Sequence, residues 1–243
     1  MNFAFPLAKA TRLLLYGITV CACWILLSHC AAIGKADSSC DTIRIVSNDL
    51  TLVEAEQYCR YAIAERQKVE RFWGTTWTEI IHIDVDNRYK ISRALTTKRR
   101  GFIEMPLNGV RAQTSGLLHE MVHVYAPSMN RFLAEGLAVY LQQKLGGNAA
   151  FPNFGKDLRQ LARHNLSGVS SLERLTKVRT PRPLRTVMQE EAAYILAGSF
   201  VGFLIENYGL QMFRNLYEGG NYESVYEKNL TVLETEWRSD LRR

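Results

Sequence analysis

The sequence has 243 residues, of which 47% are hydrophobic and 22% charged, with a formal net charge of +6. This composition is ordinary for a globular protein, and it excludes a disordered or low-complexity chain. The length suits one substantial domain. Half of the net charge belongs to residues 1–36, and no motif for binding RNA or DNA is present. We therefore expect no nucleic-acid partner, and we interpret the basic cluster at residues 98–100 as a solvated surface.

Residues 1–36 have the order of segments that is typical of an export signal. Lys9 and Arg12 precede an apolar run at residues 13–27, and small residues follow. This pattern predicts a cleaved signal peptide and an exported domain, either periplasmic, secreted or membrane-anchored. The run nearly reaches the roughly 20 residues of a membrane-spanning helix, so attachment to a membrane by an uncleaved anchor stays open. Lipidation at Cys30 is a third alternative, because the residues before it resemble a bacterial lipobox.

Two cysteines remain beyond this segment, Cys40 and Cys59. In an exported domain such a pair can form one disulfide, which here would tie the first strand to the first helix. Two unpaired thiols are the alternative.

The first half of the chain contains strand patterns around one long helix. Hydrophobic alternation predicts strands at residues 42–47 and 80–86, and residues 101–106 are a third, shorter candidate. Between the first two, residues 52–73 repeat apolar side chains at helical spacing.

Helices dominate the rest. A compact helix at residues 116–124 is interrupted by Pro127, and Ser128 or Asn130 can cap the next helix, which runs to about residue 145. Further helical segments are expected at residues 158–163, 171–178, 190–208 and 210–217, and from Gly220 to the C-terminus. The order predicts an α+β fold, with a small N-terminal sheet followed by a mainly helical lobe.

The sequence His119-Glu120-Met121-Val122-His123 is an H-E-x-x-H motif. On a helix, residues i and i+4 share a face, so both imidazoles can bind one tetrahedral zinc ion. Glu120 would border the open coordination position and could take a proton from a water that attacks a carbonyl. The alternative is a helix whose histidines merely form hydrogen bonds in the core.

Glu135 is the candidate third ligand. It lies among apolar neighbours in the helix after Pro127, where an unpaired buried carboxylate would be costly. Coordination to a cation would remove that cost, so we expect one Zn²⁺ per chain. Gly136 is expected to let the two helices of the site approach closely. A glutamate on the solvated stripe of an amphipathic helix is the alternative.

These residues resemble a known family. The H-E-x-x-H helix, the short break and the sequence Leu-Ala-Glu-Gly-Leu-Ala-Val-Tyr-Leu at residues 133–141 resemble the gluzincin clan, in particular its peptidase MA-like domains. The helix that contains Tyr194 and ends at Tyr208-Gly209 is similar to the family's later helix. The closing residues 233–237 are similar to its C-terminal segment. The metzincin pattern fails, because Met129 stands where a third histidine would be required.

The resemblance implies a single zincin-like metallopeptidase domain at residues 37–243. It implies that His119, His123 and Glu135 bind zinc and that Glu120 is the general base.

It also implies that the Tyr194 phenol steadies the oxyanion, although Tyr194 could equally be a core residue with a satisfied hydroxyl. Residues 101–106 would correspond to the edge strand that pairs with an extended peptide.

The resulting hypothesis is an exported zinc-dependent peptidase that acts on a peptide or protein substrate. One alternative is a catalytically inactive zinc- or peptide-binding domain on the same scaffold, and another is a membrane-tethered interaction module with structural histidines. The presence of Glu120, which no structural zinc site requires, favours catalysis. We expect His82 to be packed within its strand and His164 to face solvent.

Overall fold

The computed structural model describes residues 36–95, 99–167 and 169–243. The expected leader lies outside the described residues except for Ala36, so its cleavage, lipidation at Cys30 or use as an anchor stays a prediction. Lys98 of the expected basic cluster lies outside them as well. No helix in the described ranges is long and apolar enough to cross a membrane.

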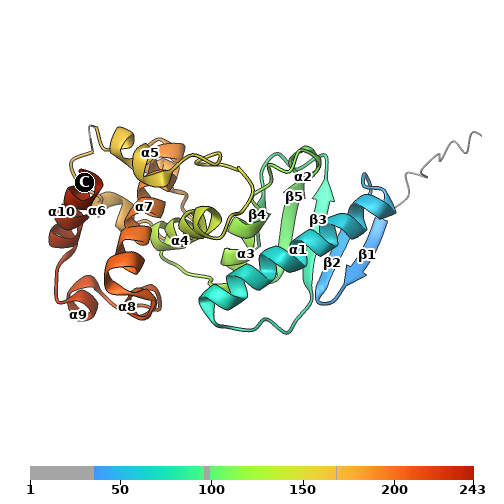
Figure 1. Ribbon diagram of the computed structural model, residues 1–243, viewed down its shortest axis with the longest axis horizontal. Helices are drawn as coiled ribbons and strands as arrows, with labels where there is room; N and C mark the ends of the chain where they lie inside the picture. The colour runs from blue at the N-terminus through green and yellow to red at the C-terminus, as the bar shows by residue number, and fades with distance from the viewer. Residues whose placement is uncertain (1–35, 96–98, 168) are drawn as a thin grey trace, which may run out of the picture. The chain divides into compact units, whose positions relative to one another are not determined.

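The N-terminal part of the described chain is a five-stranded sheet in the order β1-β2-β3-β5-β4 (Figure 1). The three central strands, β2, β3 and β5, are parallel, and an antiparallel strand lies at each edge. The strands are β1 (Ala36–Cys40), β2 (Ile43–Ser47), β3 (Ile81–Asp86), β4 (Arg93–Ala94) and β5 (Phe102–Pro106).

All three expected strands are present, as β2, β3 and β5, but the edge strand was assigned wrongly. Residues 101–106 were expected at the edge, whereas β5 pairs with β3 on one side and β4 on the other. The edge is β4, which has only two residues and therefore no hydrophobic alternation to detect. Strand β1 also escaped prediction, because its Ala-Asp-Ser-Ser-Cys sequence has low strand propensity.

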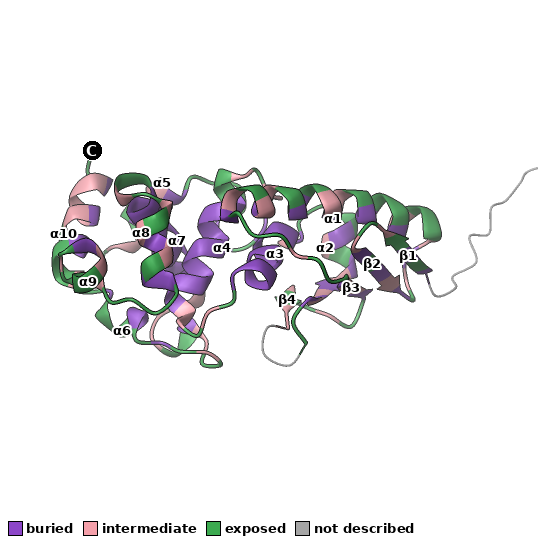
Figure 2. Ribbon diagram, turned by 90° about the horizontal axis from the view of Figure 1, so that it is seen from below, coloured by how far each residue is buried: buried purple, intermediate pink, exposed green. Residues whose placement is uncertain are grey.

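Helix α1 (Leu52–Trp73) connects β2 to β3 and lies across one face of the sheet (Figures 1 and 2). Thr51 begins it with a capping box: its hydroxyl accepts from the Glu54 amide, and the Glu54 carboxylate accepts from the Thr51 amide. Gly74 ends it in the left-handed conformation, with φ 69°. Because it lies across the sheet, α1 buries the apolar side chains at alternate positions of the strands, as the hydrophobic alternation of the sequence predicts.

The remainder of the described chain is mainly helical, which confirms the α+β fold. The expected final helical stretch is broken at Glu227, whose φ of 55° is left-handed. The helices are α2 (Leu107–Arg111), α3 (Leu117–Tyr125), α4 (Arg131–Lys144), α5 (Leu158–Asn165), α6 (Glu173–Thr176), α7 (Glu190–Tyr208), α8 (Leu210–Tyr217), α9 (Tyr222–Tyr226) and α10 (Leu230–Leu241), with a 3-10 turn at Leu184–Thr186.

Helices α4 and α7 pack against each other unusually closely. A Cβ atom added at Gly136 would lie 2.6 Å from the Ala197 carbonyl oxygen, and one at Gly198 would lie 2.6 Å from Val139 Cγ1. Only glycine allows this approach without a shift of the neighbouring atoms. Gly136 was expected to face the H-E-x-x-H helix, so this expectation is wrong: its contact is with α7.

Cys40 of β1 and Cys59 of α1 form a disulfide, with Cα atoms 6.2 Å apart. The bond joins the outermost strand to the helix that covers the sheet. This settles the pairing that the sequence left open. The first strand of the chain is β1, however, which the sequence did not reveal.

We expect the free energy of unfolding of the Cys40→Ala/Cys59→Ala double variant to be about 3 kcal/mol lower than that of the wild type. The reason is that the bond closes a loop of 19 residues in the unfolded chain. Guanidinium unfolding of the full chain measures the difference. A reductant should shift the wild type by a similar amount and leave the double variant unchanged. Equal stability of the oxidised and reduced wild type would contradict this account.

Candidate metal centre

Helix α3 carries the H-E-x-x-H residues and is buried along its whole length (Figure 2). It packs against α1, α4 and strands β4 and β5. After α3 the chain breaks at residues 126–129, and the Asn130 side chain caps α4 by accepting a hydrogen bond from the Leu133 amide. The break lets α4 pass beside α3, and the first turns of α4 then face the two histidines.

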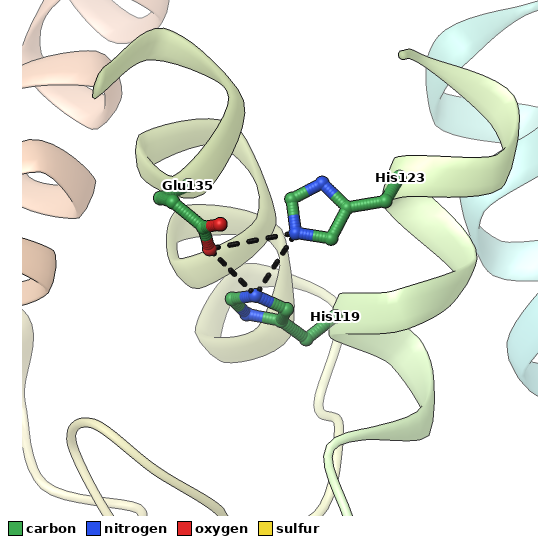
Figure 3. Close-up of side chains that lie close together, drawn as sticks. All are labelled: His119, His123 and Glu135. Carbon is green, nitrogen blue, oxygen red and sulfur yellow. Dashed lines mark hydrogen bonds and ion pairs between the residues drawn. The ribbon is translucent and has the colours of Figure 1, made fainter. Parts of the chain in front are cut away.

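Three side chains from these two helices converge on one point (Figure 3). His119 Nε2 lies 3.0 Å from Glu135 Oε2 and 3.2 Å from His123 Nε2. His123 Nε2 lies 3.4 Å from the same carboxylate oxygen. The structure therefore brings together the three residues that the sequence suggested as ligands.

The spacing of these atoms fits a tetrahedral zinc ion. With zinc–ligand distances of about 2.0–2.1 Å, tetrahedral ligands are about 3.3 Å apart, and the three observed separations bracket that value. Two imidazoles and one carboxylate are also a known donor set of catalytic zinc sites, which keep one position open. Hydrogen bonding alone explains the cluster less well, because His119 has one Nε2 hydrogen at most for two neighbours.

Glu135 is the most enclosed member of the cluster, with 1% of its surface exposed. Burial opposes its ionisation, but the adjacent imidazoles of His123 and His119 hold its pKa well below the usual range. Its second oxygen, Oε1, lies 2.5 Å from Arg131 Nη2, one turn earlier on α4. The side chain is thus an ionised ligand candidate rather than a residue of a solvated stripe, the alternative that the sequence left open.

Glu120 has its hydrogen-bond partner outside this group. Its Oε2 atom accepts a hydrogen bond of 2.7 Å from the backbone amide of Ala94 in the edge strand β4. Burial is the main reason that the pKa of Glu120 is raised, and the Glu135 charge adds to the effect. A carboxylate of raised basicity beside the edge strand is suited to accept a proton.

Tyr194 of α7 lies beside the histidines. Its ring is stacked near His119, with ring centroids 6.4 Å apart and an angle of 14° between the planes. The Tyr194 hydroxyl accepts a hydrogen bond of 3.5 Å from Arg131 Nη2. Burial and the Glu135 charge raise the pKa of Tyr194, so the phenol stays protonated. It is therefore both a core residue with a hydroxyl partner and a donor close to the candidate site.

The remaining histidines of the described chain lie outside the cluster. His82 on β3 stacks against Phe102, with ring centroids 4.5 Å apart and planes within 6°, as expected of a packed residue. His164 is exposed on α5, also as expected.

Two contacts of the site were not found by sequence reasoning. Arg131 had a usable signal, because it lies four residues before Glu135 and such pairs meet on one helix face. Ala94 had none. Its role comes from a backbone amide in a two-residue strand that only the tertiary fold places beside Glu120.

Comparison with known proteins gives one structural likeness. No protein-family model matches the sequence, and no curated protein matches it either. The chain is similar to a crystal structure of a mutant M1 zinc metallopeptidase from Deinococcus radiodurans, with 16% identity and a TM-score of 0.44. The match covers 82% of this chain and 47% of the other, so this chain spans less than half the length of that peptidase. The geometry of the site, rather than this likeness, supports the functional interpretation.

We expect the full chain to bind one zinc ion and to lose it when His123 is replaced by alanine, because two donors remain where three are needed for a stable site. Elemental analysis after desalting gives the metal content. Added zinc should raise the melting temperature of the metal-free wild type, because the ion binds the folded state.

His164→Ala is the matched control: it removes an exposed imidazole and should keep full zinc content. Equal zinc in the His123→Ala variant and the wild type would show that the metal binds elsewhere.

Proposed function

We propose that this protein is a zinc-dependent peptidase that hydrolyses bonds in a peptide or protein substrate. The observation that carries the proposal is the convergence of His119, His123 and Glu135 within 3.4 Å of one another, with Glu120 next to His119 on α3. Structural zinc sites are closed by four protein ligands and need no adjacent carboxylate. This site has three candidate ligands and an adjacent carboxylate, so it resembles a catalytic zinc site more than a structural one.

His119, His123 and Glu135 would hold the metal. When bound there, zinc would polarise the substrate carbonyl and increase the acidity of a water. Arg131 keeps Glu135 in place by its ion pair with the oxygen that faces away from the imidazoles.

Glu120 would act as the general base and then as the general acid. Its raised pKa favours uptake of a proton near neutral pH, and the Ala94 amide fixes the direction of its carboxylate. The same group would deliver the proton to the leaving amine. Because Glu120 is buried, the carboxylate is shielded from bulk water that would weaken its basicity.

Tyr194 would donate a hydrogen bond to the oxygen that becomes negative as the carbonyl is attacked. Its hydroxyl accepts from Arg131, which leaves its own hydrogen free to donate. Its raised pKa keeps that hydrogen in place. The neighbouring guanidinium would further favour negative charge at this position.

The edge strand β4 would bind the substrate backbone. In the described residues β4 pairs only with β5, so its other edge has no strand neighbour. An extended peptide can add a strand to such an edge. The hydrogen bond from Ala94 to Glu120 shows that this edge borders the proposed base, so a peptide there would lie beside it.

We further propose that residues 37–243 form one exported metallopeptidase domain. The Cys40–Cys59 disulfide supports this, because disulfides persist mainly in oxidising compartments outside the cytosol. Removal of the N-terminal segment, its lipidation at Cys30 or its use as a membrane anchor is part of the same proposal. No nucleic-acid partner is expected.

We expect Glu120→Gln to retain zinc and to lower kcat about 10²- to 10⁴-fold, because the amide cannot accept the proton but keeps the shape of the side chain. Hydrolysis of a peptide mixture, followed by mass spectrometry, measures the loss.

Glu56→Gln, at an exposed position of α1, is the charge-matched control and should hydrolyse the mixture at the wild-type rate. If the zinc-loaded wild type hydrolyses nothing, the inactive zinc- or peptide-binding alternative is favoured. If Glu120→Gln keeps full activity, the assignment of the base is wrong.

We expect Tyr194→Phe to lower kcat about 10²-fold while KM and zinc content change little, because the lost hydrogen bond forms only as the oxyanion develops. The ring and its packing on His119 remain. Steady-state kinetics separate the two parameters, and a rise in KM with unchanged kcat would instead assign Tyr194 to substrate binding.

A further inference from the structure

Two large aromatic side chains lie at the surface close to the metal centre. Phe151 is 40% exposed and Phe154 is 54% exposed, and both belong to the loop between α4 and α5. Their rings form an edge-to-face pair with centroids 6.2 Å apart. The exposed part of a phenylalanine adds nothing to the stability of the fold, because an apolar side chain stabilises it only through the surface that is removed from water.

A continuous series of ring contacts connects this pair to the metal ligands. Phe151 meets the Tyr194 ring edge-to-face, with centroids 5.4 Å apart. Tyr194 in turn stacks near His119 at 6.4 Å. Phe151 is therefore two ring contacts away from His119, and Phe154 is three.

The loop backbone is held by buried amide side chains. Gln142 of α4 donates from Nε2 to the carbonyl oxygens of Ala150 and Phe151, at 3.4 and 3.3 Å. The buried Asn153 donates to the Lys156 carbonyl at 2.8 Å. Gln142 lies seven residues, or about two helical turns, after Glu135 on the same face of α4. One helix thus positions both a metal ligand and the aromatic loop.

Phe154 also adopts an unfavourable backbone conformation. Its φ of +47° lies in the left-handed region, which asparagine or glycine adopts far more readily than phenylalanine. The conformation is held by a hydrogen bond of 2.8 Å from the Phe154 amide to the Ala150 carbonyl. A residue that is both exposed and strained is not selected for stability, and such residues concentrate where function requires them.

We propose that Phe151 and Phe154 form an apolar subsite that binds one bulky apolar side chain of the peptide substrate. This subsite, named here the Phe pair, rests on the proposed peptidase function and supplies a preference for aromatic or long aliphatic residues near the cleaved bond. The rings present apolar surface to the occupant, and their edge-to-face geometry suits a third ring or a leucine side chain.

The size and place of the Phe pair identify this occupant. A stable protein interface covers about 800 Å² on each partner, far more than two half-exposed rings provide. A single aromatic side chain buries about 150–250 Å², which matches them. The contact of Phe151 with Tyr194 connects the Phe pair to the proposed site, so a side chain of the bound peptide is the occupant that this position favours.

The first test compares peptides that differ only at one residue near the cleaved bond. The zinc-loaded full chain is given an equimolar peptide mixture in which that position is Phe, Leu, Ala or Asp. We expect kcat/KM to be about 10- to 100-fold higher for Phe and Leu than for Ala. Phe154→Asn should reduce this preference to less than about threefold.

Stability separates this role from a structural one. Because asparagine tolerates the left-handed conformation and removes exposed apolar surface, Phe154→Asn should melt at the same temperature as the wild type or higher. A structural residue would give a lower melting temperature and a uniform loss for all peptides. Val232→Ala, at a side chain 41% exposed on α10, is the control and should keep the preference.

A binding measurement distinguishes failure of the Phe pair from failure of the peptidase proposal. Phenylalanine hydroxamate and acetohydroxamate share a metal-binding group, and calorimetry on the zinc-loaded chain compares them. We expect phenylalanine hydroxamate to bind at least about 10-fold more tightly, and Phe154→Asn to abolish the difference.

Hydrolysis without an apolar preference, or a preference that Phe154→Asn retains, would overturn the Phe pair and leave the peptidase proposal standing. No hydrolysis, but a hydroxamate difference that depends on Phe154, would keep the subsite and overturn the peptidase. No hydrolysis and equal binding of both hydroxamates would overturn both.

Discussion

The placement of an almost fully buried carboxylate between helices α3 and α4 constrains how these two helices pack. Glu135 has 1% of its surface exposed, and an unpaired charge at such a position would be strongly destabilising. Its two oxygens are therefore matched on opposite sides, one by the imidazoles of His119 and His123 and the other by Arg131. The two imidazoles thereby hold α3 beside α4, and Arg131 holds the first turn of α4 against Glu135.

Helix α4 connects the remaining features of the site. On one side, Gly136 lets α4 pack directly on the backbone of α7, which carries Tyr194 to the site. Two turns beyond Glu135, Gln142 fixes the loop that displays Phe151. A small displacement of α4 would therefore move Glu135, the contact with α7 and the aromatic loop together.

Much of the fold and of the site followed from local patterns in the sequence. The apolar periodicity of α1, the long apolar run of α7 and the His119-to-His123 spacing on α3 depend on neighbours within a few residues. The carboxylate of Glu135 was also identifiable, because a charge among apolar residues needs a partner. Strand β4 and its contact with Glu120 could not be found, since two residues contain no period and a backbone amide has no sequence signal.

The sequence by itself determined most of the elements, the spacing of the H-E-x-x-H histidines and the need of Glu135 for a charged partner, because helical spacing and the cost of burial are local or compositional properties. Only the tertiary structure decided that Gly136 faces α7, that β4 is the edge strand and that Phe151 contacts Tyr194. Each of these depends on segments distant in the sequence, whose distances are set by packing of the whole chain rather than by any residue pattern.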